Sequence, residues 1–264
     1  MLLAGSGTTY WGSNDDPGMK RVRFRDPAGA VRDGLWNDDG TVSFADRTYD
    51  RADVAVLAPC EPSKVVCVGR NYVEHADEMD SDVPDRPLLF LKPPNAVASH
   101  GSDVTLPAGK DRLDFEAELG VVMGEQAKHL DADDAMDAVA GFTCVNDVSN
   151  RDDQRQEQNW VRGKAFDGAA PIGPVLATPD EVPDAAAVRS YVNGDRKQDG
   201  SLDQMVFSVP ELLAEITTYL TLEPGDVVAT GTPAGVGRLS DGDAVRVEVE
   251  GVGSLEHTVT IPDA

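Results

Sequence analysis

The chain is poor in lysine and in positive charge overall. Its 264 residues include seven lysines and 16 arginines against 33 aspartates and 14 glutamates, which gives a formal net charge of -24. Without a basic stripe to replace the counterions on phosphates, nucleic acid and anionic membrane surfaces are excluded as partners. The acids are spread through loops such as 131–137 and 241–243. This pattern is typical of the Asp-rich, solvated surface of proteins from a high-salt (halophilic) cytoplasm.

Cysteine and long apolar runs are also scarce. Cys60, Cys67 and Cys144 stand in apolar stretches without Cys-x-x-Cys spacing, which favours buried free thiols in a reducing compartment. No run of 18 apolar residues occurs, and residues 1–18 lack the regions of a signal peptide. We therefore expect a cytoplasmic protein. Residues 1–18 should be a disordered extension, or should precede the true start, because Met19 opens a strand-like stretch.

The rest of the chain reads as many short strands with few helices. Strand patterns separated by turn signals indicate a small β-rich N-terminal domain over 19–62. A buried strand, "KVVCVG", opens a larger catalytic domain over 63–264. Helical patterns are confined to a few segments, mainly 70–79, 131–142 and 209–226. No βαβ rhythm appears, so we expect an α+β fold that is predominantly β.

The stretch "DFEAELGVV" (114–122) raises an electrostatic question. Its alternation predicts one strand with Asp114, Glu116 and Glu118 on the same face, about 6.6 Å apart. Carboxylates about 7 Å apart repel by roughly 2 kcal/mol at an effective dielectric near 20, so a buried column needs a cation. A solvated strand face is the simpler interpretation of this stretch alone. A hard divalent ion is the alternative, with Asp147, at the end of an apolar strand, as a third ligand.

Three other features could carry chemistry. His75 and Glu78 stand at i and i+3 of a predicted helix, where the carboxylate could orient an imidazole that activates water, although such pairs are usually surface pairs. Lys164 lies among small and apolar residues and could neutralise a developing anion, although a lone lysine is usually exposed. The glycine-rich segment 228–237 lacks Gly-Lys-Ser/Thr, so it is either a plain turn or a cradle for a carboxylate.

Seven stretches in order, spanning about residues 64–240, resemble the fumarylacetoacetate hydrolase family, in particular its acylpyruvase and oxaloacetate decarboxylase branch. They are "VGRNYVEHADEM", "PLLFLKPPNAV", "DFEAELGVVMG", "GFTCVNDVSNRDDQ", "GKAFDGAAPIGP", "VNGDRKQDGSLDQMVFSV" and "LEPGDVVATGTPAGVG". The resemblance implies a mixed β-sandwich roll with a small β-rich N-terminal domain, assembled as a homodimer.

The resemblance also implies a metal centre and a set of substrate residues. Mg²⁺ or Mn²⁺, with Ca²⁺ as a further candidate, would be held by Glu116, Glu118 and Asp147, while Asp114 is left as a supporting residue. The implied catalytic residues are His75 and Glu78 as a water-activating dyad, with Gln154 and Lys164 stabilising an anion. The implied substrate-binding residues are Arg70, Asn71, Arg151 and Thr232.

The function implied is a divalent-metal-dependent hydrolase that cleaves the C–C bond of acylpyruvate-type 2-oxo acids through a metal-bound enolate. The same site could decarboxylate oxaloacetate. One alternative is an isomerase, tautomerase or hydratase of unsaturated 2-oxo diacids. Another is a non-catalytic ligand-binding relative, which the retention of both the dyad and the three acids argues against.

Overall fold

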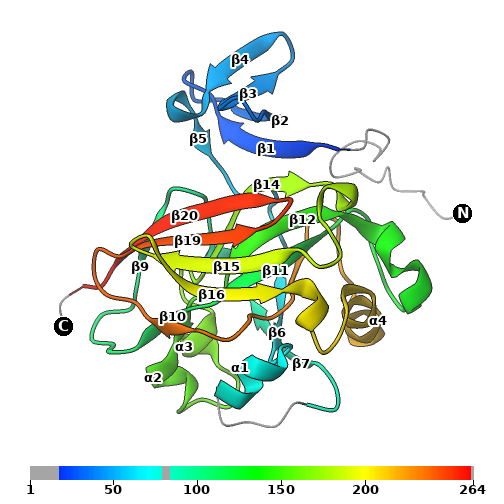
Figure 1. Cartoon of the computed structure of the whole chain (residues 1–264), viewed down its shortest axis with the longest axis vertical. Coiled ribbons are helices and arrows are strands. Elements are labelled where there is room, and N and C mark those ends of the chain that lie inside the picture. The colour runs from blue at the N-terminus through cyan, green and yellow to red at the C-terminus, as the bar shows by residue number, and fades with distance from the viewer. Residues whose placement is uncertain (1–17, 79–83, 263–264) are drawn as a thin grey trace, which may run out of the picture.

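The computed structural model describes residues 18–78 and 84–262. Nearly all of the expected N-terminal extension therefore lies outside the described residues. Figure 1 shows a body of packed β-sheets with short helices at one end and a small group of N-terminal strands extending from the other. The prediction of an α+β, predominantly β fold is confirmed.

A twelve-stranded sheet forms the centre of the molecule. Its main path runs β4-β3-β2-β1-β14-β12-β11-β17-β6-β7, while β5 pairs with β1 and β8 with β14. The strands are β1 (Lys20–Arg25), β2 (Val31–Trp36), β3 (Thr41–Phe44), β4 (Arg47–Asp50), β5 (Ala55–Val56), β6 (Val65–Gly69), β7 (Leu88–Lys92), β8 (Val97–Ala98), β11 (Ala117–Met123), β12 (Val139–Asn146), β14 (Ala170–Ala177) and β17 (Val227–Ala229). Every residue of β11, β12 and β14 is buried, so both faces of this part of the sheet are covered.

Two smaller sheets complete the body. The five-stranded one is ordered β16 (Asp195–Ser201), β15 (Ala187–Val192), β19 (Ala244–Val249), β20 (Gly253–Thr260) and β9 (Asp103–Thr105). The three-stranded one is ordered β13 (Ser149–Asn150), β10 (Leu113–Phe115) and β18 (Gly237–Arg238). The main core joins central strands of the large sheet to alternate residues of the five-stranded sheet, which is the layered packing of a sandwich.

The helices are short and lie at the edges of the sheets. They are α1 (Val73–Glu78), α2 (Arg151–Gln154), α3 (Val161–Lys164) and α4 (Val209–Tyr219). Helix α4 confirms the helix expected from residue 209, although it ends at Tyr219. Ser208 and Glu211 form a capping box at its start, and Leu212, Leu213 and Ile216 are buried against the sheet.

Two local predictions are wrong. The segment expected as a helix over 131–142 forms only a 3₁₀ turn, η3 (Ala132–Ala138), before β12 begins at Val139. From Val139 onward the backbone pairs with β11, and from Phe142 also with β14, and this pairing overrides the helical pattern there. The stretch 114–122 is two strands, because β10 ends at Phe115 and β11 begins at Ala117. Glu116 stands at the junction, where its N–H donates to a side chain, Asn146 Oδ1, at 2.9 Å.

The N-terminal strands continue the large sheet. Strand β1 pairs with β14 at two positions, Lys20 with Ala177 and Arg21 with Leu176. The division into domains at residue 62 stays a prediction. Among the described residues, no helix is long and apolar enough to cross a membrane.

Candidate active site

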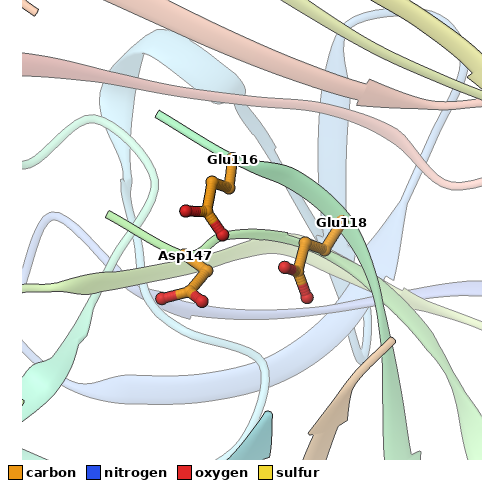
Figure 2. A group of neighbouring side chains, drawn as sticks. All are labelled: Glu116, Glu118 and Asp147. Atoms are coloured by element: carbon orange, nitrogen blue, oxygen red, sulfur yellow. The ribbon is translucent and has the colours of Figure 1, made fainter. Parts of the chain in front are cut away.

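Three carboxylates converge where β11 and β12 run side by side. Glu116 precedes β11, Glu118 lies within it, and Asp147 follows the last residue of β12. Their side chains point toward one another in Figure 2, and one oxygen of each lies within 4.8 Å of the others. The three residues are 5 %, 1 % and 1 % exposed, so a solvated strand face is the wrong interpretation of this stretch. Buried acids in such proximity require positive charge.

Two basic side chains supply part of that charge. Lys164 Nζ lies 2.6 Å from Asp147 Oδ2 and 3.2 Å from each carboxylate oxygen of Glu116. Arg151 donates to Glu116 Oε1 at 2.5 Å and, through Nε, to Asp114 Oδ2 at 2.9 Å. Asp114, the member of the acid column without an assigned ligand role, therefore orients the Arg151 guanidinium.

The charges give Glu116 and Glu118 opposite pKa shifts. Burial raises the pKa of Glu116, but the charges of Lys164 and Arg151 outweigh it and hold that pKa below its usual range. Burial, with Asp147 and Glu116 nearby, raises the pKa of Glu118 well above its usual value, although Gly231 N–H donates to its Oε2 at 2.9 Å. One carboxylate of the trio is thus ion-paired, while another lacks a cation of its own.

The trio has the chemistry of a site for a hard divalent ion. Its donors are all carboxylate oxygens, which Mg²⁺, Mn²⁺ and Ca²⁺ prefer. In addition, Asp147 Oδ1 is buried and accepts no hydrogen bond within the described part of the chain, although the Lys92 ammonium lies 2.7 Å from it. Glu118, by contrast, is buried without a cation of its own, and a divalent ion would offset its charge. Glu116, Glu118 and Asp147 therefore fit a divalent metal.

Helix α1 carries the predicted proton-transfer pair. His75 Nδ1 lies 3.3 Å from Glu78 Oε2, as the i,i+3 spacing predicted. His75 is 6 % exposed. The carboxylate of Glu78 also accepts from Gly235 N–H, at 3.1 Å through Oε2, which fastens α1 to the turn between β17 and β18. The pair is therefore anchored to this turn through Glu78.

One pocket of about 200 Å³ connects these groups. Eight of the eleven predicted site residues line it: Arg70, His75, Glu116, Glu118, Arg151, Gln154, Lys164 and Thr232. Asp147 adjoins it through the carboxylate trio and Glu78 through His75. Gln154 accepts from Arg151 at 2.7 Å through its side-chain oxygen, which leaves its amide N–H groups for another acceptor.

Asn71 lies behind the pocket. Its side chain is fully buried, donates to Thr230 O at 2.8 Å and to Phe207 O at 3.0 Å, and accepts from Phe207 N at 2.8 Å. These bonds fix the turn in which Arg70 adopts a left-handed conformation with φ of 59°. Asn71 thereby positions the pocket-lining Arg70, while direct contact of Asn71 with a substrate stays a prediction.

The hydroxyl of Thr232 already has two partners. It donates to Ala117 O at 2.8 Å and accepts from Gln198 Nε2 at 2.7 Å. Gln198 also donates to Pro233 O at 2.7 Å and accepts from Ala117 N at 3.0 Å. This buried amide therefore joins the start of β11 to the turn after β17. The predicted hold of Thr232 on a substrate carboxylate stays a prediction.

Sequence reasoning missed several residues at this site. Lys92, Gln198, Arg155 and Trp160 were not singled out, although Arg155 and Trp160 line the pocket. Lys92 carried a readable signal, because it ends an apolar strand, "LLFLK", in a chain with only seven lysines. Gln198 carried none, since it stands in the polar run "DRKQDG".

Comparison with known proteins identifies the family. Residues 64–260 match the family described as "Fumarylacetoacetate (FAA) hydrolase C-terminal". The chain belongs to the fumarylacetoacetate hydrolase family. This membership confirms the family that the sequence resembles, and it makes the protein a member of a family of enzymes.

Three relatives show which activities are named within the fumarylacetoacetate hydrolase family. Human oxaloacetate tautomerase FAHD2A, mitochondrial, is 42% identical over 221 residues, which cover 79% of this chain and 70% of that protein. Oxaloacetate tautomerase YisK of Bacillus subtilis is 38% identical over 225 residues, covering 80% and 75%. The crystal structure of 2-hydroxyhepta-2,4-diene-1,7-dioate isomerase from Mycobacterium marinum superposes with a TM-score of 0.83 at 36% identity, covering 92% and 98%.

Proposed function

We propose that the protein is a divalent-metal-dependent enol–keto tautomerase of a small 2-oxo dicarboxylic acid, with oxaloacetate as the first candidate. The observation that carries the proposal is the composition of one pocket, which joins the carboxylate trio, Lys164 and the His75–Glu78 pair. The names of the human and Bacillus relatives support it. We prefer tautomerisation to the C–C hydrolysis that the resemblance to acylpyruvases implies.

Glu116, Glu118 and Asp147 would hold Mg²⁺ or Mn²⁺, which when bound would supply a Lewis acid to the carboxylate and 2-oxo oxygens of the substrate. Lys164 brings a buried ammonium to the same place and would stabilise negative charge that develops on the oxygen at C2. Arg151, fixed by Asp114, would orient the substrate carboxylate.

The His75–Glu78 pair would move the proton. Enol-to-keto conversion takes the proton from the oxygen at C2 and delivers one to C3, so it needs an acid–base group but no water at carbon. Because Nδ1 of His75 faces Glu78, its Nε2 is the nitrogen left to exchange a proton with the substrate. The burial of His75 and the apolar side chains of Phe90 and Trp160 on the pocket wall favour exclusion of bulk water.

The remaining arginines fit a second carboxylate. Arg70 and Arg155 both line the pocket, and guanidinium groups bind carboxylates through two parallel hydrogen bonds. The volume of about 200 Å³ is smaller than the roughly 300 to 1,000 Å³ typical of sites for drug-sized ligands. Both features favour a short diacid as the substrate.

The test measures the decay of enol-oxaloacetate absorbance with Mg²⁺ and purified protein, alongside an assay for pyruvate. We expect an acceleration that a chelator abolishes and that added Mg²⁺ restores, without stoichiometric pyruvate. The double variant Glu116→Ala with Glu118→Ala should lose Mg²⁺ binding and the acceleration, while the exposed Glu125→Ala should keep both. Pyruvate appearing as fast as the enol disappears would show decarboxylation instead, and an unchanged decay rate would refute the proposal.

Acylpyruvate hydrolysis is the second candidate, because an imidazole polarised by a carboxylate also suits activation of water. With acetylpyruvate, hydrolysis predicts a fall in diketo-enol absorbance with an equal amount of pyruvate released. Conversion of the substrate without C–C cleavage would eliminate this candidate. The homodimer also stays a prediction, and light scattering should find twice the mass of one chain.

A further inference from the structure

Lys92 is a buried cation that the proposed chemistry does not use. It is the last residue of β7, at the edge of the large sheet, and none of its surface is exposed. Its ammonium donates to three backbone carbonyls, those of Lys164 at 2.6 Å, Ala169 at 2.9 Å and Val148 at 3.2 Å. An ammonium has three protons, so these three bonds use its whole donor capacity.

The same ammonium lies beside a carboxylate of the trio. Lys92 Nζ is 2.7 Å from Asp147 Oδ1, yet that oxygen accepts no hydrogen bond among the described residues. Lys92 therefore neutralises Asp147 as an ion pair, while the hydrogen bonds of its ammonium go to the three carbonyls. Lys164, in contrast, donates directly to the other oxygen of Asp147.

We infer that Lys92 is a positioning residue for the metal centre: a fixed internal cation that holds the three carboxylates together before a divalent ion binds. The inference rests on the proposed metal site. Lys92 ties the segments that carry Asp147 and Lys164 to β7, since its carbonyl partners lie one residue after Asp147 and at Lys164 itself. Its charge offsets the mutual repulsion of acids that burial would otherwise keep apart.

This role predicts opposite changes in the stability of the metal-free protein and in its metal affinity. A simple loss of packing does not predict this combination. Without the charge of Lys92, the metal-free protein is destabilised by repulsion among the carboxylates, and a bound ion removes that repulsion. Because the metal binds the folded chain, a variant whose metal-free form is selectively destabilised must bind the metal more tightly. Removing Lys92 should therefore lower stability without metal and raise metal affinity.

The experiment compares Lys92→Met, which keeps the length of the side chain, with Lys92→Gln, which keeps a donor. Thermal unfolding is followed with chelator and with saturating Mg²⁺, and the dissociation constant for Mg²⁺ is measured by calorimetry. We expect Mg²⁺ to raise the melting temperature more in both variants than in the wild type, with affinity increased about three- to tenfold.

Lys64→Gln is the matched control. Lys64 forms an ion pair with the fully buried Asp226, and neither residue lines the pocket. This variant should lose stability equally with and without Mg²⁺ and should keep the wild-type affinity.

Several outcomes separate the possibilities. A Lys92 variant that is soluble only with Mg²⁺ supports the inference, whereas insolubility of both variants in either condition overturns it. Equal loss of stability with and without Mg²⁺, or unchanged or weaker Mg²⁺ affinity, also overturns it. So does a wild type that binds no Mg²⁺. The tautomerase proposal is judged separately, by the enol decay rate of the wild-type protein.

Discussion

At the scale of single residues, each acid of the site has a different electrostatic environment. Asp114 is paired with Arg151, Glu116 with Arg151 and Lys164, and Asp147 with Lys164 and Lys92. Unit charges 4 Å apart attract by about 4 kcal/mol at an effective dielectric near 20, which offsets part of the cost of burial. Glu118 has only the N–H of Gly231 among its described partners, so it has most to gain from a divalent ion.

His75 provides the first residue-scale prediction. His75→Asn should reduce kcat for enol–keto conversion by roughly 10²- to 10⁴-fold and leave KM nearly unchanged, because proton transfer is felt only in the transition state. Steady-state measurements of enol decay give both constants. His129→Asn is the control, since His129 is exposed and does not line the pocket. A His75 variant with full kcat would remove the pair from the mechanism.

His257 provides a prediction about pH. Its ring lies 2.8 Å from the Asn146 amide through Nε2, and burial lowers its pKa to about 4, against smaller opposing effects of the Thr258 carbonyl and Asp103. The imidazole of His257 takes up a proton near pH 6.5 in the unfolded chain but only near pH 4 in the folded chain. The free energy of unfolding should therefore fall as pH drops from 6.5 toward 4.

The pH effect is isolated by His257→Gln, whose amide oxygen can still accept from Asn146. Between pH 7.5 and pH 5, the wild type should lose about 2 kcal/mol of unfolding free energy more than the variant. Urea unfolding at the two pH values measures this difference. Equal losses in both proteins would show that His257 titrates normally.

At the scale of elements, the fold class and most of the strands could be predicted from the sequence. The apolar run 64–69, for example, predicts β6. The break at Glu116 could not be predicted, because it depends on the side chain of Asn146, thirty residues away, taking the place of a strand partner. The strand that begins within 131–142 could not be predicted for a similar reason, because it is stabilised by pairing with the distant strands β11 and β14.

Part of the candidate site could be predicted from the sequence, because some of its residues lie close together along the chain. His75 with Glu78, and Glu116 with Glu118, are close in sequence, so local spacing brings their side chains together. Asp147, after an apolar strand, and Lys164, among small and apolar residues, were indicated by their local context, whereas Thr232 was implied only by the family resemblance. Lys92 and Gln198 act through contacts with distant backbone, for which no local pattern exists.

The turn that fastens α1 provides a prediction at this scale. Gly235 has φ of 100°, and a Cβ there would lie 2.3 Å from Lys197 O, so Gly235→Ala must shift the turn. The shift should weaken the contact with Glu78, lowering kcat roughly tenfold while leaving Mg²⁺ affinity intact. Steady-state kinetics tests the change in kcat, and calorimetry tests the Mg²⁺ affinity.

Gly242→Ala is the control for Gly235→Ala, because Gly242 has φ of 79° but open space around it. Equal effects of both substitutions would contradict the expectation.

At the scale of the whole molecule, the charge of -24 dominates. Most of the carboxylates that produce this charge lie on the surface. Their mutual repulsion destabilises the compact state, and salt screens that repulsion. Raising KCl from 0.05 M to 1 M should therefore raise the melting temperature by roughly 5 °C, on the basis of about 2 to 4 °C per kcal/mol. Differential scanning fluorimetry measures the change. A non-ionic osmolyte at equal osmolality is the control, and a flat salt profile would refute the screening argument.

The pairing of β6 with β17 joins segments about 160 residues apart and places Glu118, on the neighbouring strand, beside Gly231. Contacts of such sequence separation form late, because the loop they close has a high entropic cost. We therefore expect the trio, which the β11–β12 pairing assembles, to gain its Gly231 partner late in folding. A divalent ion bound there would leave the rate of folding unchanged and slow the rate of unfolding, which lengthens the lifetime of the native enzyme.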